Sequence, residues 1–517
     1  MPISRTIKTN LYKDSVALMR IAQTILTRDG VRQATLVMGT PANKDILAQA
    51  GLLDPALEKA RPSDIMIVVD AETGDVLDAA AAEVARLLEG ERPSASSGHA
   101  AELPLRSISM ARSRDGAEAA LAQISVPGPY AAAEAMKALR QGLHVFLFSD
   151  NVPLEQERAI KVVARGKGLL VMGPDCGTAI VGGTPLGFAN VVRRGTISLV
   201  GASGTGLQEV TCQIHALGQG VRHAIGTGGH DVSAEIGGIT MQQALDLLAA
   251  DPGTRVIAIV SKPPAPEVAR QVLERAAKID KPVVALFLGD DLPAARLPQN
   301  VTAVPTLYAA AVAAVGRVGG KDAAAKEDAG AWLCPVHDEA ARLAAGQRLV
   351  RGLYSGGTFC AEAQLIWRDL GLRVHSNAPL DKRAADVAPE GAHAAIDLGA
   401  DEFTVGRPHP MIDPSTRIDR IAATARDSST AAIVLDVVLG YGSHPDPAGA
   451  LAPAIAAARA ACAKEGRHLP VVSFVCGTEE DPQRLSAQQA QLREAGALVL
   501  PSSTAAARAA GEIALRA

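Results

Sequence analysis

Two glycine-rich turns place hydroxyl side chains beside backbone that can approach a ligand closely. The first is Gly201-Ala202-Ser203-Gly204-Thr205-Gly206, and the second is Ser355-Gly356-Gly357-Thr358. Each follows an expected strand and opens an expected helix, where free N–H groups attract anions. Either turn alone is also explained by close packing of a strand on a helix. Two equivalent turns could direct both helix starts at one phosphate.

Three further loops follow expected strands. One contains Gly228 and Gly229, one contains Asp175 within Gly173–Thr178, and one contains Gly440. Ligands of open α/β sheets bind beyond the carboxyl ends of the strands, so these loops are expected to lie near the two glycine-rich turns. Asp175 is equally typical of a turn that serves only its own backbone. None of these turns fits a nicotinamide fingerprint or a P-loop.

A proline-rich loop at 407–414 (RPHPMIDP) holds three ionisable side chains, and prolines restrict its backbone. Arg407 could clamp a carboxylate or phosphate with two parallel hydrogen bonds. His409 could act as a general acid or base, because its ordinary pKa lies near neutrality. The alternative is a rigid structural loop in which His409 caps a helix and Asp413 starts the next one.

Lys262 follows another expected strand, where its ammonium group could neutralise a bound anion or face the solvent. Six cysteines are scattered without a CxxC pair, which argues against a zinc site and a disulfide framework. We therefore expect no metal site, and we expect the protein to reside in a reducing compartment. Cys176 and Cys360 lie beside the glycine turns but have no sequence partner that marks a nucleophile.

Short Val/Ile-rich runs alternate with alanine-rich helical stretches along most of the chain, as in 256–260, 266–278 and 282–288. Continuous apolar strands separated by helices indicate parallel sheets buried on both faces, so the fold class is α/β. Residues 198–225 and 349–376 share a strand, a Ser/Gly turn, a helix ending in Leu-Gly and a second strand. Residues 194–318 and 346–517 are therefore predicted to be two copies of one doubly wound domain, joined by a linker at 319–345.

The 517 residues carry a net charge of −4, 48% hydrophobic residues and 21% charged residues, which is ordinary for a folded globular protein. No basic cluster interleaved with aromatic residues is present, so a nucleic-acid partner is not expected. No apolar run approaches the ~20 residues that span a bilayer, and the first residues lack the apolar stretch of a signal peptide. These features favour a cytoplasmic protein without a membrane partner.

Several strings resemble known families. VMGPDCGT (171–178), VGASGTG (200–206) and IGTGGHD (225–231) resemble the α-subunit of succinyl-CoA synthetases, and the segment from 346 resembles the C-terminal domain of their β-subunit. More specific strings, which cover the chain in order, resemble the FdrA family: KDSVALM (13–19), MGTPANK (38–44), FSDNV (148–152), VGRPHPMIDP (405–414) and LDVVLGYG (435–442). The resemblance implies a Rossmann-like CoA-binding-type domain over 1–193, followed by two flavodoxin-like succinyl-CoA-ligase-type domains.

Three departures from the synthetases bear on the chemistry. The loop that carries their phosphorylated histidine corresponds here to DDLPAARLPQNVTAV (290–304), which contains no histidine. The acidic residue that supports this histidine falls in Ser261–Pro264, and no ATP-grasp domain fits the chain. CoA is retained as a candidate ligand, although no CoA-type glycine loop opens residues 1–60.

The family resemblance implies an oxamate carbamoyltransferase subunit of the AllF type, in purine and allantoin breakdown. That reaction converts oxalurate and phosphate into oxamate and carbamoyl phosphate, and it implies a hetero-oligomer with two further protein subunits. No cofactor is implied beyond these small anionic substrates. One alternative is an acyl-CoA synthetase that uses a phosphoryl carrier from a partner subunit, and another is a non-catalytic scaffold.

Overall fold

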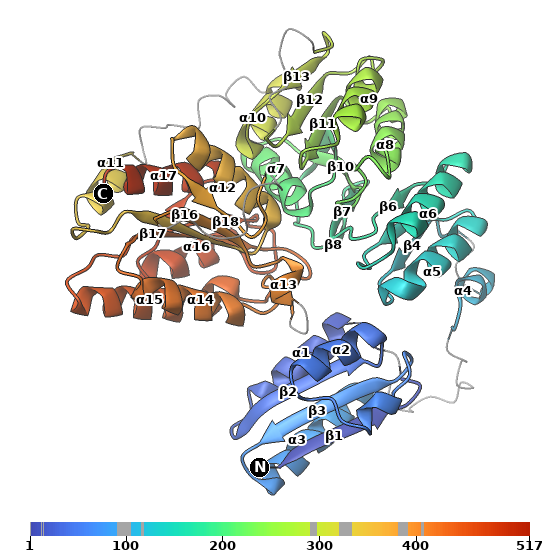
Figure 1. Cartoon of the computed structure of the whole chain (residues 1–517). Helices are drawn as coiled ribbons and strands as arrows, with labels where there is room; N and C mark the ends of the chain where they lie inside the picture. The colour runs from blue at the N-terminus through green and yellow to red at the C-terminus, as the bar shows by residue number, and fades with distance from the viewer. Residues whose placement is uncertain are drawn as a thin grey trace. The chain divides into compact units, whose positions relative to one another are not determined.

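The computed structural model describes residues 2–11, 13, 15–89, 105–114, 118–289, 297–319, 333–380, 391–404 and 408–517. The chain divides into two compact units (Figure 1). The first comprises residues 1–115 with 401–408, and the second comprises residues 116–400 with 409–517. Arg407 lies outside the described residues.

The first unit is built on a three-stranded antiparallel sheet in the order β1-β3-β2. Its elements are β1 (Ile3–Lys8), α1 (Ser15–Leu26), β2 (Val31–Met38), α2 (Pro41–Gln49), the 3₁₀ helix η1 (Leu57–Lys59), β3 (Ile65–Ala71), α3 (Gly74–Glu89), α4 (Ile108–Arg114) and α13 (Asp401–Thr404). The central strand β3 is apolar on both faces and contributes to two cores, one with α1 and α3 and one with α2 and η1.

This unit differs from the single Rossmann-like domain predicted over 1–193. The sheet of residues 3–71 is antiparallel, and a separate parallel sheet follows from residue 121. A strand buried on both faces has the same continuous apolar pattern in either sheet type, so the sequence pattern could not separate the two. The second sheet has the order β4-β5-β6, formed by β4 (Leu121–Ile124), α5 (Gly128–Arg140), β5 (His144–Leu147), α6 (Leu154–Gly166) and β6 (Val171–Met172).

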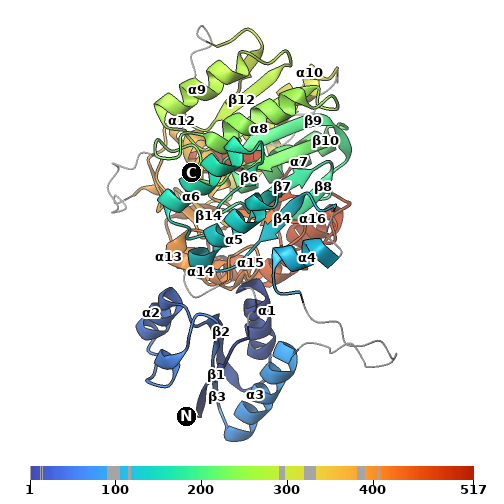
Figure 2. The ribbon, with the colours of Figure 1, turned by 90° about the vertical axis from the view of Figure 1, so that its right-hand side faces the viewer.

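The first ligase-type domain contains a seven-stranded sheet in the order β13-β12-β11-β9-β10-β7-β8. Its elements are β7 (Thr178–Val181), β8 (Thr184–Gly187), β9 (Arg194–Gly201), α7 (Gly204–Ala216), β10 (Val221–Gly226), α8 (Ile239–Ala250), β11 (Val256–Ser261), α9 (Pro266–Ala276), β12 (Val283–Phe287), β13 (Val301–Ala303) and α10 (Leu307–Arg317). Strands β9 to β13 are parallel, whereas β7 and β8 form an antiparallel edge. Helices α8 and α9 cover one face and lie in front of the sheet in Figure 2, and α7 and α10 cover the other.

The second ligase-type domain contains a six-stranded parallel sheet in the order β15-β16-β14-β17-β18-β19. Its elements are α11 (Leu333–Ala340), β14 (Leu349–Tyr354), α12 (Gly357–Asp369), β15 (Val374–His375), β16 (His393–Asp397), α14 (Ser415–Arg426), β17 (Thr430–Val438), α15 (Pro447–Lys464), β18 (Val471–Cys476), α16 (Leu485–Glu494), β19 (Leu498–Leu500) and α17 (Ser503–Leu515). Helices α14, α15 and α16 lie on one face, and α11, α12 and α17 lie on the other (Figure 1).

The two ligase-type domains confirm the predicted α/β class, and four of their strands share one order, as the internal repeat predicts. The order β13-β12-β11-β9 of the first sheet matches β19-β18-β17-β14 of the second. The copies differ at the next strand, because β10 lies beside β9, whereas β16 lies between β14 and β15. Part of the predicted linker at 319–345 is helix α11, whose Val336 is fully buried, and residues 320–332 lie outside the described part of the chain.

The helices between the two sheets share one core. Leu207 and Val210 of α7 belong to the same apolar cluster as Phe359 and Trp367 of α12. The Trp367 indole N–H donates to the backbone carbonyl of Ala507 in α17, so the polar atom of this large buried side chain is satisfied. The starts of α7 and α12, which carry the two glycine turns, are therefore held in one packed layer.

Candidate functional site

The two predicted glycine turns meet. Ser203 Oγ and Thr358 Oγ1 lie 2.6 Å apart in a buried hydrogen bond between the two ligase-type domains. A methyl group on Gly206 would lie 2.3 Å from Ser203 Oγ, and one on Gly356 would lie 2.8 Å from Thr205 Cγ2. These two glycines therefore allow the helix starts to pack directly on each other, and the hydroxyl groups bind one another where a shared anion was expected.

Part of the second turn is filled by a carboxylate of the chain itself. Asp436, which is fully buried in β17, accepts from Ser355 N–H at 2.8 Å, Ser355 Oγ–H at 2.6 Å and Gly356 N–H at 3.1 Å. Arg417 lies 3.1 Å from the same carboxylate and is itself buried. This internal ion pair fixes the turn, so the Ser355 and Gly356 donors predicted to hold a ligand serve the fold instead.

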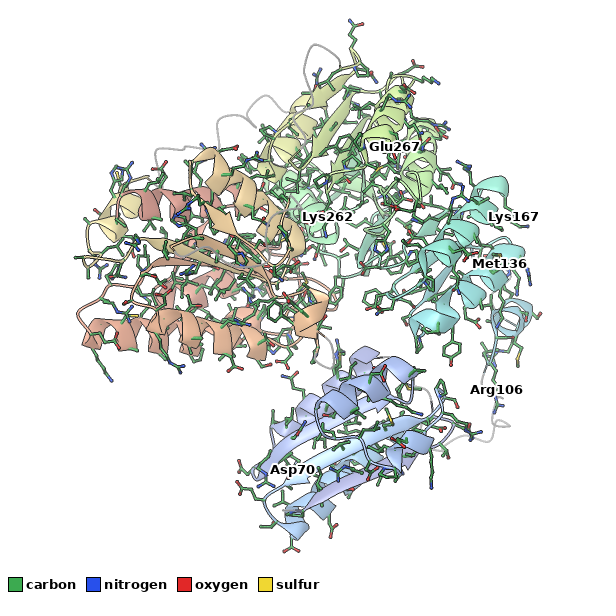
Figure 3. All side chains as sticks on the ribbon, viewed as in Figure 1. Asp70, Arg106, Met136, Lys167, Lys262 and Glu267 are labelled. Atoms are coloured by element: carbon green, nitrogen blue, oxygen red, sulfur yellow. The ribbon has the colours of Figure 1, made fainter. Side chains whose placement is uncertain are left out.

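The outer edge of the second turn has different surroundings. Gly357, the first residue of α12, is partly exposed, and no side chain caps this helix start. A methyl group on Gly357 would lie 2.6 Å from Asp397 Oδ2 and 3.8 Å from Lys262 Nζ. Lys262 comes from the loop after β11 of the other ligase-type domain, on the side that faces the second (Figure 3). A cation from one domain thus lies at a helix start of the other.

His409 lies beside the same corner. A methyl group on Gly399 would lie 2.6 Å from His409 Nε2 and 3.2 Å from Asp397 Oδ1. The His409 ring also packs on Phe188 of the first ligase-type domain, with ring centroids 6.4 Å apart. Gly357, Lys262, Asp397 and His409 therefore form one group, named here the corner site.

The protonation state of His409 follows from its contacts. Burial lowers the pKa of His409 to about 4, an effect that the Asp436 carboxylate opposes and the Arg417 guanidinium strengthens. Its Nδ1 accepts the Met411 backbone N–H at 3.2 Å, so the neutral ring carries its proton on Nε2. At neutral pH, His409 can donate a hydrogen bond from Nε2, but that nitrogen has no lone pair to act as a base.

The remaining predicted residues serve local structure. Asp413 Oδ1 accepts the Ser415 N–H at the start of α14, which is the structural alternative foreseen for Asp413. The Gly440 N–H donates to Gln483 Oε1 at 3.1 Å, and a methyl group there would lie 2.5 Å from the Ala189 carbonyl. Gly440 is therefore a packing position and does not offer its N–H to a ligand.

The loops around Asp175 and Gly228 meet each other. A methyl group on Gly228 would lie 2.1 Å from the Pro174 carbonyl, and one on Gly229 would lie 4.0 Å from Asp175 Oδ2. Gly201 is equally constrained, because a methyl group on it would lie 2.1 Å from the Val260 carbonyl. Gly204 and Gly229 are exposed, unlike Gly201 and Gly228, and Thr178 Oγ1 lies 3.5 Å from the position of a methyl group added to Gly204.

Three residues of this region were missed by sequence reasoning: Asp397, Asp436 and Arg417. Asp436 is the acid inside the otherwise apolar run AIVLDVVLG (432–440), and Asp397 ends the strand HAAID. An acid at the carboxyl end of a buried parallel strand is a signal that could have marked both positions. Arg417 lies in an amphipathic helix and has no such signal.

Two buried glutamates link the ligase-type domains reciprocally. Glu209 of α7 accepts the Ser503 N–H at the start of α17, at 3.1 Å. Glu362 occupies the same position in α12 and accepts the Leu307 N–H at the start of α10, at 2.8 Å. Each helix of the central pair thus caps the last helix of the other domain, which leaves the Glu209 charge pointing away from the glycine turn.

Comparison with known proteins places this geometry in context. Three family models match: "AllF, heavy metal-associated domain" over residues 1–104, "CoA binding domain" over 192–289 and "CoA-ligase" over 353–513. The CoA-binding match thus falls on the first ligase-type domain, whereas the CoA-binding-type domain was predicted at 1–193. No helix among the described residues is long and apolar enough to cross a membrane.

The residues present do not fit a soft-metal site in the first unit. Heavy metals of that class prefer thiolate ligands, and residues 1–104 contain no cysteine. Within the described ranges, no group of three or more His, Cys, Asp or Glu side chains could hold a metal ion. The match to the AllF domain therefore describes the fold of this unit, and no metal chemistry is derived from it.

The relatives extend the comparison to whole chains. YahF of Escherichia coli strain K12 is 44% identical over 508 residues, which is 98% of this chain and 97% of YahF. The α-subunit of an ADP-forming succinate–CoA ligase from Aquifex aeolicus is 29% identical over 33% of this chain and 56% of that subunit. The ADP-forming sulfoacetate-CoA ligase subunit SauD from Bilophila wadsworthia is 27% identical over 41% of this chain and 75% of that subunit. With an AllF-type N-terminal domain, CoA-binding and CoA-ligase domains and this near full-length similarity, the chain belongs to the FdrA family.

Proposed function

We propose that the chain is the FdrA-type subunit of a carbamoyltransferase complex, which converts oxalurate and phosphate into oxamate and carbamoyl phosphate. The observation that carries the proposal is the corner site, where Lys262 Nζ lies at the partly exposed, uncapped start of α12. A lysine ammonium group and helix N–H groups together favour a phosphate. The AllF match over residues 1–104 supports the same assignment.

The reaction needs little beyond positioning and charge. One oxygen of phosphate attacks the carbamoyl carbon of oxalurate, the bond from that carbon to the oxamate nitrogen breaks, and a proton passes to the departing nitrogen. Lys262 and the α12 start would hold the phosphate, and the His409 Nε2–H would donate to the carbamoyl oxygen as negative charge develops there. The proposal includes two further protein subunits, small anionic substrates and a cytoplasmic location.

The test is phosphate-dependent oxamate release by the full complex. Gly357→Asp adds a negative side chain at the start of α12, and Lys262→Met removes the cation while keeping the length of the side chain. Each change should lower the rate by about tenfold or more, because a hydrogen bond to a charged group is lost or opposed. Lys278→Met alters an exposed lysine after α9 and should leave the rate unchanged. Normal rates in folded Gly357→Asp and Lys262→Met variants would refute the proposed function.

A second candidate is an acyl-CoA synthetase whose phosphoryl carrier comes from a partner subunit. The CoA-binding match over 192–289 favours it, although the Ser203 and Thr205 side chains there are buried against α12. Incubation of the isolated chain with labelled ATP discriminates the two candidates. Acid-labile phosphate on a histidine of this chain would favour the synthetase. A non-catalytic scaffold is the third candidate, favoured by the direct Ser203–Thr358 contact and by the Asp436 carboxylate in the second turn.

A further inference from the structure

Phe188 is the side chain of the first ligase-type domain that contacts His409. It follows β8, and its N–H donates to the Gly177 carbonyl at 2.7 Å. Its own carbonyl accepts the Thr178 Oγ1–H at 2.7 Å, so the backbone is fixed on both sides. The ring packs on Phe148, with ring centroids 5.7 Å apart. These contacts, all from residues before the second ligase-type domain, hold Phe188 in place.

The second ligase-type domain leaves room for this ring. Gly442, in the loop after β17, has a φ of +83°, and a methyl group there would lie 2.8 Å from Phe188 Cδ1. A residue with a side chain would therefore push the ring away from this loop. The His409 ring lies on Phe188 with centroids 6.4 Å apart and an angle of 39° between the ring planes. Gly442 and His409 together receive the Phe188 ring from the other domain.

The His409 ring needs a second contact to fix its direction. Its Nδ1 accepts the Met411 N–H at 3.2 Å, which holds one side of the ring. The Nε2–H lies on another side, and its direction changes when the ring tilts about the Nδ1 contact. Packing on Phe188 restricts this tilt, because aromatic rings prefer a limited set of relative orientations. His409 is only half-buried, so a fixed neighbouring ring matters for its position.

We infer that Phe188 is a positioning residue, which holds the His409 ring so that its Nε2–H is directed at the carbamoyl oxygen beside the bound phosphate. Lys262 and Phe188 belong to the first ligase-type domain, whereas His409 and α12 belong to the second. Phe188 thus aligns the hydrogen-bond donor of one domain with the cation of the other. The inference rests on the proposed function for the reaction, and on the contact between Phe188 and His409 for its geometry.

Two substitutions at Phe188 test this in phosphate-dependent oxamate release by the full complex. Phe188→Leu removes the ring but keeps an apolar side chain, and it should lower kcat by about tenfold or more. A single oxyanion donor contributes about 10²–10³-fold, and a misaligned donor loses part of this. The KM for phosphate should change by less than about twofold, since Lys262 and Gly357 are unaltered. Phe188→Tyr keeps the ring and should keep the wild-type kcat, as should the control Tyr130→Leu, which removes an exposed ring of α5.

NMR of the full chain labelled with ¹⁵N-histidine gives a second measurement. In the wild type the His409 signals should stay constant between about pH 5.5 and 8, because burial lowers the pKa of His409 to about 4. Phe188→Leu should admit water to the ring, so the pKa should rise toward its ordinary value and the signals should shift in this interval. The charged groups that face the ring are unaltered in the variant: Asp436 of β17, Arg417 of α14 and Asp397 of β16.

Circular dichroism should confirm that the variants are folded. Should Phe188→Leu not fold, Phe188→Met replaces it, because its flexible side chain fills more of the same space. A wild-type kcat in the folded variant, a loss that lies in the KM for phosphate, or an unchanged His409 titration would overturn the inference. If the wild-type complex releases no oxamate, the proposed function fails, and the NMR measurement alone decides whether Phe188 holds the His409 ring.

Discussion

His409 is half-buried, and its ring connects the two ligase-type domains. Its Nδ1 accepts a backbone N–H, and its ring packs on Phe188. Both contacts suit the neutral ring, whose proton on Nε2 makes it a fixed donor. Asp436 is likewise fixed by hydrogen bonds, since its one carboxylate accepts from three donors of the second glycine turn.

The lowered pKa of His409 predicts how stability changes with pH. The unfolded chain binds a proton at His409 near pH 6.5, whereas the folded chain does so only near pH 4. Between these values the unfolded state holds more protons, so this stabilising contribution is present above pH 6.5 and is lost as the pH falls. His409→Gln should therefore lose less unfolding free energy than the wild type between pH 7 and pH 5, by on the order of 1–2 kcal/mol.

Chemical denaturation at both pH values measures this difference, and His337→Gln is the matched control because His337 is exposed in α11. The control should show the same pH dependence as the wild type. An identical pH dependence in His409→Gln would mean that the ring titrates normally in the folded chain. The same low pKa predicts that His409 contributes no inflection near pH 6.5 to the rate profile.

At this scale the sequence predicted the types of residue better than their roles. Lys262 and His409 were selected for charge and for position after a strand, and both lie in the corner site. Gly206, Gly356 and Gly440 were selected as ligand-binding glycines, but the structure uses them for close packing between domains. A glycine pattern indicates that some group approaches the backbone closely at that position. It does not indicate whether that group belongs to a ligand or to another part of the protein.

The junction of α7 and α12 depends on glycine in the first turn of each helix. Gly206→Ala would bring a methyl group to 2.3 Å from Ser203 Oγ and 3.1 Å from Thr358 Cγ2. The hydroxyl pair must then separate, and such overpacking should cost about 1–3 kcal/mol of unfolding free energy. Gly316→Ala in α10 is the control, since nothing lies within 4 Å of its added methyl group. It should be neutral or stabilising by about 0.5–1 kcal/mol.

Thermal or urea denaturation of the two alanine variants decides the question. Equal stabilities for Gly206→Ala and Gly316→Ala would show that the helix starts do not pack in solution as they do here. A lower stability of Gly206→Ala, with an unchanged m-value, would support direct packing and argue against a water-filled or anion-filled gap between the turns.

Among elements, the repeat was the most predictable feature, because turn, helix length and helix end recur together at 198–225 and 349–376. Four strands of each sheet share one order, and only the insertion of β16 between β14 and β15 departs from it. The antiparallel sheet of residues 3–71 was not predicted, since helix and strand alternate there as they do in a parallel fold. Strand direction depends on contacts between distant segments, which a period of hydrophobicity does not encode.

At the scale of the whole molecule, each ligase-type domain provides a buried glutamate that caps a helix start of the other domain. Burial raises the pKa of Glu209 to about 7, while the Ser503 N–H opposes this rise. The folded state therefore holds more protons than the unfolded state between about pH 4.5 and 7, so stability falls as the pH rises through this window. Glu209→Gln should remove this fall, which is on the order of 1–2 kcal/mol between pH 5.5 and 8.5.

The variant keeps an oxygen that can accept from the Ser503 N–H, so the cap itself is retained. Glu267→Gln, an exposed change in α9, controls for the loss of one carboxyl group. Urea denaturation at pH 5.5 and pH 8.5 provides the measurement. A wild-type stability that rises over this interval as steeply as that of Glu209→Gln would contradict a protonated Glu209 in the folded chain.

The Glu209 cap also affects when the first ligase-type domain can finish folding during synthesis. Its partner Ser503 follows 294 residues later in the chain. At a synthesis rate of about 5–20 residues per second, a ribosome needs roughly 15–60 s to make that stretch. During this interval α12 and then α17 are made, so the apolar surface of α7 with Leu207 and Val210 is covered only in stages. The packing of the first ligase-type domain is thus completed only when nearly the whole chain has been synthesised.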